Sequence, residues 1–267
     1  MTTPAPLTLV KVGGAVVEQA DSLSQLLQAF RRIPSPKVLV HGGGRSATDL
    51  AARLGIQSHF ALGRRITDAP TLQVVTMVYG GLVNKRIVAQ MQALGINALG
   101  LTGADMDILR AHRRPPVPAT DGGEPLDFGY VGDVDSCNAL RLAQLLHSGI
   151  TPVIAPLTHD GKGNLLNTNA DTVAAEVAKA LAPLFSVSLV YCFEKPGVLS
   201  DPDDPSSLIP SINEADFRHL VAQGTISGGM IPKVENALAA CRAGVREVLI
   251  TRADQLIPPS GTRIQLH

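Results

Sequence analysis

Short apolar runs alternate with longer amphipathic segments along most of this chain. The runs have the length and residue types of buried strands, and the segments repeat apolar residues at the spacing of one helix face. The predicted strands cover residues 7–12, 37–41, 98–101, 152–155, 187–193, 247–251 and 262–266. The predicted helices cover 22–33, 45–54, 71–94 with a break near a glycine pair, 136–147, 170–181, 213–222 and 233–243.

This alternation predicts an α/β fold with a mostly parallel sheet and helices on both of its faces. In such sheets, ligands bind at the carboxyl ends of the strands. Residues 108–134 depart from the pattern, because short β pieces there flank a loop rich in Pro and Gly at 115–125. A boundary between two lobes is expected near Ala182, dividing residues 1–181 from residues 182–267.

Composition narrows the functional classes. The chain of 267 residues has a formal net charge of zero, so it has no basic field for nucleic acid and no polybasic patch for a membrane. Its three cysteines lie far apart, which fits a reducing compartment better than a disulfide framework or a zinc site. No signal peptide is visible, and no apolar stretch approaches the ~20 residues of a membrane span. Together with the cysteines, this predicts a cytoplasmic protein. The histidines lack ligand spacing, so we expect no metal site formed by the protein itself.

Two lysines stand beside glycines at opposite ends of the chain. Lys11 lies in an apolar strand that runs into Gly13 and Gly14, and Lys233 follows the glycine pair 228–229. A charge in a buried strand is costly unless it is paired. A lysine ahead of a glycine turn suits a phosphate, because backbone amides can approach it and the ammonium supplies charge. This pattern raises the hypothesis that the two lysines meet at a phosphate in transfer.

A second signal is the triplet Gly42, Gly43 and Gly44, which follows His41 between a predicted strand and a helix. Glycines at a helix N-terminus expose amides to an anion, and three of them exceed what a turn needs. An esterase oxyanion hole would require a G-x-S-x-G nucleophile elbow, which the sequence lacks. A dinucleotide site would require an acidic residue about 20 residues further on, which is missing. Phosphoryl transfer is the third chemistry, and without a Walker motif it would not use a P-loop.

Three further polar clusters fall at element boundaries. Arg65 precedes a predicted helix, and its forked guanidinium suits a carboxylate, although alone it is better explained as part of a solvated basic pair. Asn169 and Asp171 fit an N-cap and a first-turn acid. That leaves Asn167 in a strand end where an apolar residue is expected. Glu194 ends the strongest apolar strand, where an adenine or ribose could sit in an α/β sheet.

Taken together, these residues resemble the amino acid kinase family and, within it, the N-acetyl-L-glutamate kinases of arginine biosynthesis. The resemblance runs from about Leu7 to Leu266, nearly the whole chain. Its motifs are residues 10–14 (VKVGG), 41–44 (HGGG), 63–67 (GRRIT), 167–171 (NTNAD), 228–233 (GGMIPK) and 261–264 (GTRI). Each motif is weak alone, but their occurrence in this order is a specific signal.

The resemblance implies a three-layer αβα sandwich with two lobes, of which the first binds acylated glutamate and dimerises and the second binds ATP. The implied reaction is phosphorylation of the γ-carboxylate of N-acetyl-L-glutamate, with Mg²⁺ bound mainly by the oxygens of ATP. Lys11 and Lys233 would flank the phosphoryl group, with Asp171 orienting both. The implied substrate contacts are Gly43, Gly44, Arg65 and Asn167, and the implied nucleotide contacts are Gly13, Gly14, Glu194, Gly197 and Met230.

Departures from the family pattern leave alternatives open. The usual T/S-D-V-x-G before the adenine site is FEKPG here, at residues 193–197, so the role of Glu194 differs from the pattern. The substrate-lid segment also differs, and Arg113 or Arg114 could meet the second carboxylate of N-succinyl-L-glutamate.

Two other functions remain as alternatives, one within the same superfamily and one from another class. A kinase for carbamate, aspartate or uridylate is disfavoured by the contexts of Arg65 and Asn167. A non-catalytic amino-acid sensor is disfavoured because Lys11, Asp171 and Lys233 are retained together. The stretch before Leu7 is short for the extra helix of arginine-inhibited hexamers in this family. We therefore expect a homodimer without that feedback.

Overall fold

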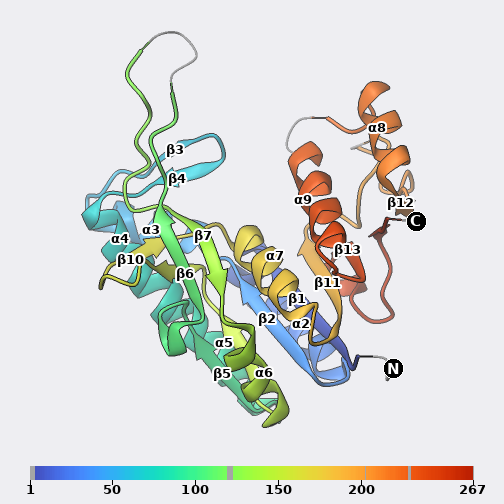
Figure 1. Cartoon of the computed structure of the whole chain (residues 1–267), viewed down its shortest axis with the longest axis horizontal. Helices are drawn as coiled ribbons and strands as arrows, with labels where there is room; N and C mark the ends of the chain where they lie inside the picture. Colours follow the sequence, from blue (N-terminus) through green and yellow to red (C-terminus); the bar gives the residue numbers. More distant parts are fainter. Residues whose placement is uncertain (1–3, 119–122, 202, 228–229, 267) are drawn as a thin grey trace.

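The central element of the protein is a mostly parallel sheet (Figure 1). The computed structural model describes residues 4–118, 123–201, 203–227 and 230–266. Within these ranges, eight strands pair in the order β12-β14-β13-β11-β1-β2-β8-β5. They are β1 (Pro6–Val12), β2 (Lys37–His41), β5 (Ala98–Leu101), β8 (Thr151–Ile154), β11 (Ser186–Phe193), β12 (Ser211–Ile212), β13 (Glu247–Arg252) and β14 (Thr262–Ile264). Neighbouring strands run parallel, except that β13 and β14 run antiparallel.

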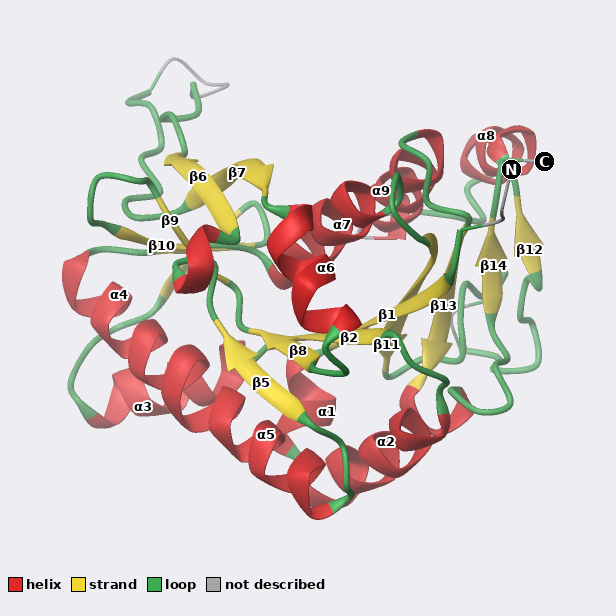
Figure 2. Ribbon diagram, turned by 60° about the horizontal axis from the view of Figure 1, so that its bottom comes forward, coloured by secondary structure: helices red, strands yellow, loops and turns green. Residues whose placement is uncertain are grey.

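Helices cover both faces of this sheet, as Figure 2 shows. One layer contains α1 (Gly14–Glu18), α2 (Ala20–Arg32), α3 (Gly44–Arg53), α4 (Ala69–Val75), the π-helix η1 (Thr76–Val83) and α5 (Asn84–Ala93). The other contains α6 (Ala139–His147), α7 (Ala170–Leu181), α8 (Glu214–Ala222) and α9 (Met230–Arg242). Alternate strand residues point to opposite layers. Leu9 accordingly packs in one apolar cluster and Val10 in the other, which confirms the predicted α/β sandwich.

Smaller β elements stand at one end of the sandwich, around the strand ends. Within the described residues, a four-stranded sheet has the order β10-β9-β6-β7, and β3 pairs with β4 as a hairpin. These strands are β3 (His59–Ala61), β4 (Arg64–Ile66), β6 (Leu109–Arg113), β7 (Gly132–Cys137), β9 (Leu157–His159) and β10 (Leu165–Asn167). The end of the β6–β7 connection lies against the residue after β4, because Thr67 N donates to Phe128 O and Tyr130 N donates to Thr67 O. The predicted short β pieces are present on both sides of this connection, of which residues 119–122 lie outside the described residues.

Three predicted helices depart most from the structure, and the limits of the others differ by at most two residues. The helix expected at 136–147 begins at Ala139, because β7 continues to Cys137 and the side chain of Asn138 caps the helix instead. The helix expected from residue 233 already begins at Met230. The stretch 71–94 is divided into α4, η1 and α5, and the π-helical turns include the glycine pair where a break was expected.

The predicted lobe boundary falls where α7 ends, at Leu181, before β11 begins at Ser186. β1 and β11 pair side by side along their length, so one sheet runs through both predicted lobes. The division into 1–181 and 182–267 remains a prediction. In the part of the chain that the structure describes, no helix has the length and apolar character needed to cross a membrane.

Candidate active site

Lys11 is a buried cation at the carboxyl end of β1. It lies between β11 and β2, opposite Tyr191 and Val40, and only 6% of the residue is exposed. Burial of an ammonium is costly unless an anion accompanies it. Asp171 provides that anion, because its Oδ1 lies 2.7 Å from Lys11 Nζ. The predicted contact between these two residues is therefore made.

Asp171 is held in place by the start of α7. The side chain of Asn169 caps this helix, and its Oδ1 accepts hydrogen bonds from the backbone amides of Asp171 (2.7 Å) and Thr172 (3.2 Å). An N-cap of this kind satisfies amides that have no partner within the helix. The hydroxyl of Tyr191 also donates to the backbone carbonyl of Asp171 (3.3 Å). Asn169 is thus an N-cap, as one interpretation of the sequence had it.

Lys233 joins this group through an aromatic ring. It lies in the first turn of α9, and its Nζ is 4.3 Å from the centroid of the Phe193 ring. Lys11 Nζ lies 4.9 Å from the same centroid. Among the described residues, Asp171 makes no ion pair with Lys233, so the expected contact between Asp171 and both lysines is made with Lys11 alone. Gly228 and Gly229, which precede Lys233 in the motif, lie outside the described residues.

Phe193 was not predicted as a site residue. It stands where the sequence departs from the family pattern, and an aromatic residue at the end of an apolar strand reads as core. The departure itself was the one signal that could have drawn attention to it.

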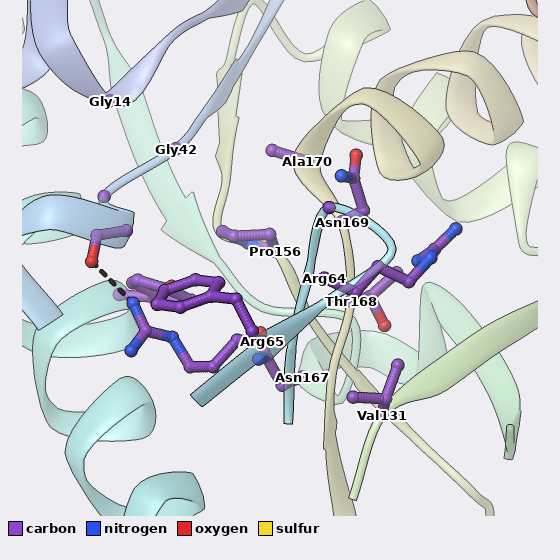
Figure 3. Close-up of a pocket in the computed structure, with 15 residues that line it drawn as sticks. Gly14, Gly42, Arg64, Arg65, Val131, Pro156, Asn167, Thr168, Asn169 and Ala170 are labelled. Carbon is purple, nitrogen blue, oxygen red and sulfur yellow. Dashed lines mark hydrogen bonds between the residues drawn. The ribbon is translucent and has the colours of Figure 1, made fainter. Parts of the chain in front are cut away.

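A cavity of about 220 Å³, here called the Arg65 cavity, lies beside the glycine triplet (Figure 3). Gly43, Gly44, Arg65 and Asn167 all line it, so the four predicted substrate contacts face one space. Figure 3 shows Arg65 on one side of this space and Asn169 and Ala170 on another. The hairpin β3–β4 positions Arg65, and the end of β10 positions Asn167.

The guanidinium of Arg65 is fixed by neutral groups. Its Nη1 donates to Ser58 Oγ (2.6 Å), and its Nη2 donates to Gly44 O (2.7 Å) and Thr48 Oγ1 (2.9 Å). Phe60 covers it at 4.6 Å from ring centroid to Cζ. Only 6% of Arg65 is exposed, and within the described residues it has no carboxylate partner. A buried, oriented cation of this kind is suited to an incoming carboxylate.

Asn167 also lines the cavity, and its side chain is held by a hydrogen bond to Thr67. Its Nδ2 donates to Thr67 Oγ1 (2.9 Å), and Thr67 Oγ1 in turn donates to the backbone carbonyl of Arg65 (3.1 Å). The residue is only 8% exposed, and its hydrogen bond to Thr67 explains how a buried polar side chain is tolerated at this strand end. The two predicted substrate residues are therefore connected through Thr67.

His41 is a buried residue that contacts the glycine triplet through its ring. Its Nδ1 lies 2.8 Å from Gly42 O and its Nε2 lies 3.1 Å from Asn84 Nδ2. Gly42 O can only accept and Asn84 Nδ2 can only donate, so the proton of the neutral ring belongs on Nδ1. Burial lowers the pKa of His41 to about 4, and the contact with Gly42 opposes this shift. His41 is thus a neutral structural residue at pH 7.

The strand ends approach closely because they carry glycine. A Cβ added at Gly42 would lie 3.0 Å from the Gly14 amide nitrogen. A Cβ added at Gly14 would lie 3.5 Å from the amide nitrogens of both Gly43 and Gly44. The end of β1 therefore lies against the amides at the start of α3, where an anion is favoured.

A second cavity of about 440 Å³, here called the Lys233 cavity, adjoins the first. The predicted nucleotide contacts line it together with Lys233: Gly13, Gly14, Glu194, Gly197 and Met230. Gly14 also lines the Arg65 cavity, so the two cavities meet at this residue. At Gly197 a Cβ would lie 2.5 Å from Leu208 Cδ1 and 2.9 Å from the Thr262 amide nitrogen, so only glycine fits there.

The arginines of the β6–β7 segment do not reach the Arg65 cavity. Arg113 pairs with Asp127 (2.8 Å) and Arg114 pairs with Asp133 (2.7 Å). The second arginine that lines the cavity is Arg64. Its pKa is lowered chiefly by burial and also by nearby Arg114, while Asp133 raises it.

Fold and site together define a phosphotransferase of a known family. Residues 6–252 match the model of the amino acid kinase family, and the chain belongs to this family. It is 60% identical to the acetylglutamate kinase of Bacteroides thetaiotaomicron over 259 residues, which cover 97% of this chain and 98% of that protein. It is 42% identical to the acetylglutamate kinase of Methanopyrus kandleri, over 97% of this chain and all of that protein (100%).

Solved structures support the same fold. A protein of Streptococcus mutans UA159 superimposes with a TM-score of 0.77 at 28% identity, covering 98% of this chain and 99% of that one. A carbamate kinase from Giardia lamblia bound to AMP-PNP gives a TM-score of 0.71 at 14% identity, with coverage of 98% and 99%. At that identity the second likeness concerns the fold alone.

Proposed function

We propose that this protein is an ATP-dependent acetylglutamate kinase, which phosphorylates the γ-carboxylate of N-acetyl-L-glutamate to an acyl phosphate in arginine biosynthesis. The observation that carries this proposal is the meeting of two cavities at Gly14, beside the charged group of Lys11, Asp171 and Lys233. The relatives named acetylglutamate kinase, which match nearly the whole chain, support it.

In this proposal the acylated glutamate occupies the Arg65 cavity. Arg65 binds its α-carboxylate, because the guanidinium is oriented and has no carboxylate partner among the described residues. Asn167 binds the acyl amide, and the amides of Gly43 and Gly44 receive the γ-carboxylate end and the phosphoryl oxygens. The γ-carboxylate then points toward Gly14.

ATP occupies the Lys233 cavity, with Gly13, Gly14, Glu194, Gly197 and Met230 around it. Among the described residues no cluster of three His, Cys, Asp or Glu side chains could hold a metal ion. Mg²⁺ would be bound mainly by the phosphates of ATP, where it would neutralise part of their charge.

The reaction needs positioning and charge rather than a general base. The substrate γ-carboxylate is already ionised at pH 7, so one of its oxygens can attack the γ-phosphorus directly while the bond to ADP breaks. Lys11 and Lys233 stabilise the negative charge on the transferring oxygens. Asp171 pairs with Lys11 and orients it between turnovers. This explains why the chain needs no Ser-His or Cys-His pair.

An ATP-dependent hydroxamate assay tests the proposal. Purified protein is offered N-acetyl-L-glutamate, N-succinyl-L-glutamate and L-glutamate in parallel, and hydroxylamine traps any acyl phosphate. We expect rapid formation with N-acetyl-L-glutamate and little with L-glutamate, which lacks the acyl amide for Asn167. Absence of product with all three acceptors would contradict the kinase and favour a sensor on the same fold.

N-Succinyl-L-glutamate is a second candidate acceptor, because one further cation lines the Arg65 cavity. That cation is Arg64, whereas Arg113 and Arg114 are paired with carboxylates. A succinyl carboxylate placed against Arg64 would offset part of the cost of burying this guanidinium. Preference for the succinyl compound in wild type, lost in Arg64→Gln, would establish this alternative.

We further propose that the enzyme is a cytoplasmic homodimer with separate acceptor and ATP lobes. In the described chain β5 ends the main sheet, and three exposed apolar side chains lie on β5 and on the preceding helix η1: Met77 (52%), Leu82 (60%) and Leu99 (38%). Lys85, at the start of α5 and three residues after Leu82, donates to Gly100 O, so the junction of η1 and α5 lies beside β5. An apolar surface next to an open sheet edge is suited to a second copy of the chain.

A further inference from the structure

The ring of Phe193 contacts both lysines of the site. Phe193 is the last residue of β11, and its centroid lies 4.9 Å from Lys11 Nζ and 4.3 Å from Lys233 Nζ. Tyr191 stacks against it at 5.9 Å with an interplanar angle of 10°. The ring is therefore held from its own strand while it contacts cations on β1 and α9.

These contacts supply an attraction that the carboxylate does not. Two ammonium groups near one another repel, and this repulsion opposes a site that needs both of them. Asp171 compensates Lys11, and among the described residues Lys233 has no ion-pair partner. The negative face of an aromatic ring attracts a cation positioned over it. Phe193 is thus a group that contacts both Lys11 and Lys233.

We propose that Phe193 is a positioning residue for phosphoryl transfer, an inference that rests on the proposed function. Its ring keeps Lys11 and Lys233 at the junction of the two cavities before the substrates bind. Both charges are then already in position when the transition state forms, so positioning them adds little to the activation free energy. A neutral ring holds an ammonium more weakly than a phosphoryl oxygen does, so the lysines can transfer to the substrate without a large penalty.

A simpler explanation is that Phe193 only forms an apolar wall of the Lys233 cavity, which it also lines. A wall depends on the size and shape of the ring, whereas attraction for cations depends on its π electrons. Fluorination separates the two, because it withdraws π-electron density with a small change in volume. Site-specific incorporation of mono-, di- and trifluorophenylalanine at position 193 therefore forms the test.

The expected result is a stepwise fall in kcat with fluorine number, reaching about tenfold for the trifluoro ring. KM for ATP and the unfolding temperature should change little, because shape and packing are kept. Phe193→Tyr should retain most of kcat and Phe193→Leu should lose it to the same extent as the trifluoro ring. This split between kcat and KM would not follow from a structural role.

Phe30 provides a matched control within the same chain. Lys37 Nζ lies 5.0 Å from the centroid of this ring and also donates to Phe30 O (2.9 Å) and Ile33 O (2.8 Å). The pair joins α2 to β2 and lines neither cavity. The same fluorination at Phe30 should leave kcat unchanged.

An active wild type whose kcat does not respond to fluorination at Phe193 would overturn the inference and leave the proposed function intact. A rise in KM for ATP at constant kcat would overturn it too, in favour of a nucleotide wall. A wild type inactive with every acceptor would instead overturn the proposed function, and this role with it.

Discussion

Two charged residues of this site are buried, which costs free energy of folding, and this cost suggests a functional reason for their presence. Lys11 is buried in a strand, where an apolar residue would fit the core without a counter-charge. Arg65 is equally buried and is fixed by neutral acceptors. Arg65 lines the Arg65 cavity, and Lys11 pairs with Asp171 and lies beside Phe193, which lines the Lys233 cavity. In the proposed function, the anions of the reaction account for the burial of these two cations.

Replacement of either lysine should lower turnover more than binding. We expect Lys11→Ala or Lys233→Ala to reduce kcat by ~100-fold or more with a smaller change in substrate KM, because the lost contact strengthens in the transition state. Steady-state kinetics of the purified variants measure this. Lys179→Ala, which removes the pair with Glu176 further along α7, is the control and should keep kcat. Near-normal turnover of Lys11→Ala would exclude its role.

His41 should make the fold sensitive to acid. Its pKa falls from 6.5 to about 4 on folding. Between these pH values His41 is therefore protonated in the unfolded chain and neutral in the folded chain. The stability that depends on neutral His41 is complete above pH 6.5 and is lost as the pH falls toward 4. At pH 4 this loss is on the order of 3 kcal/mol.

Denaturant unfolding of wild type and His41→Gln at pH 7 and pH 4 measures this effect. The difference in unfolding free energy between the two pH values should be smaller in the variant. Equal differences in the two proteins would show that His41 does not cause the acid sensitivity of the fold.

At the scale of elements, the sequence predicted most strands and helices because their patterns are local. β2, β5 and α7 have the predicted limits, and the other predicted strands of the large sheet differ by one or two residues at an end. The two-residue strand β12 was not predicted. The short helix α1 and the β3–β4 hairpin were missed, since five residues cannot show a helical period and two of three residues in His59–Ala61 are exposed. The π-helix depends on distant contacts, because Gly80 packs near Leu157 and Thr102.

The N-terminus of α7 links element stability to the site. We expect Asn169→Ala to lower the unfolding free energy by about 1 kcal/mol, because two helix amides lose their acceptor. It should also lower kcat, because Asp171 in the first turn holds Lys11. Chemical unfolding and steady-state kinetics on one preparation measure both quantities.

Asn213 caps α8 in the same manner, accepting from the amides of Ala215 (2.8 Å) and Asp216 (2.9 Å), away from the cavities. Asn213→Ala should cost similar stability and leave kcat unchanged. A fall in kcat of the same size in both variants would show that the effect of Asn169 is merely global.

At the scale of the whole molecule, the site is assembled from strand ends that are distant in sequence. The motifs predicted which glycines and charges would gather, and the structure places them around two adjoining cavities. The sequence could not predict that Phe193 would bridge the lysines, nor that Arg113 and Arg114 would be paired away from the cavity. Those facts depend on the register of β11 beside β1 and on the fold of the β6–β7 segment.

The proposed dimer also belongs to this scale. Leu82→Asp places a charge in the exposed apolar surface beside β5, and it should convert the wild-type dimer to a monomer. Sedimentation velocity measures the change. Leu54→Asp, at an exposed leucine after α3, should leave the wild-type assembly intact. A monomeric wild type would contradict the proposed assembly.

The central claim is that the γ-carboxylate of the acceptor attacks the phosphorus of ATP at the junction of the cavities. N-Acetyl-L-glutamate labelled with ¹⁸O in its γ-carboxylate is incubated with enzyme, ATP and hydroxylamine, and the phosphate released is examined by mass spectrometry. Attack by hydroxylamine at the carbonyl carbon leaves the bridging oxygen on phosphate. The account predicts one ¹⁸O in each phosphate released through the hydroxamate. Unlabelled phosphate would contradict it, because the acceptor oxygen would then not have received the phosphoryl group.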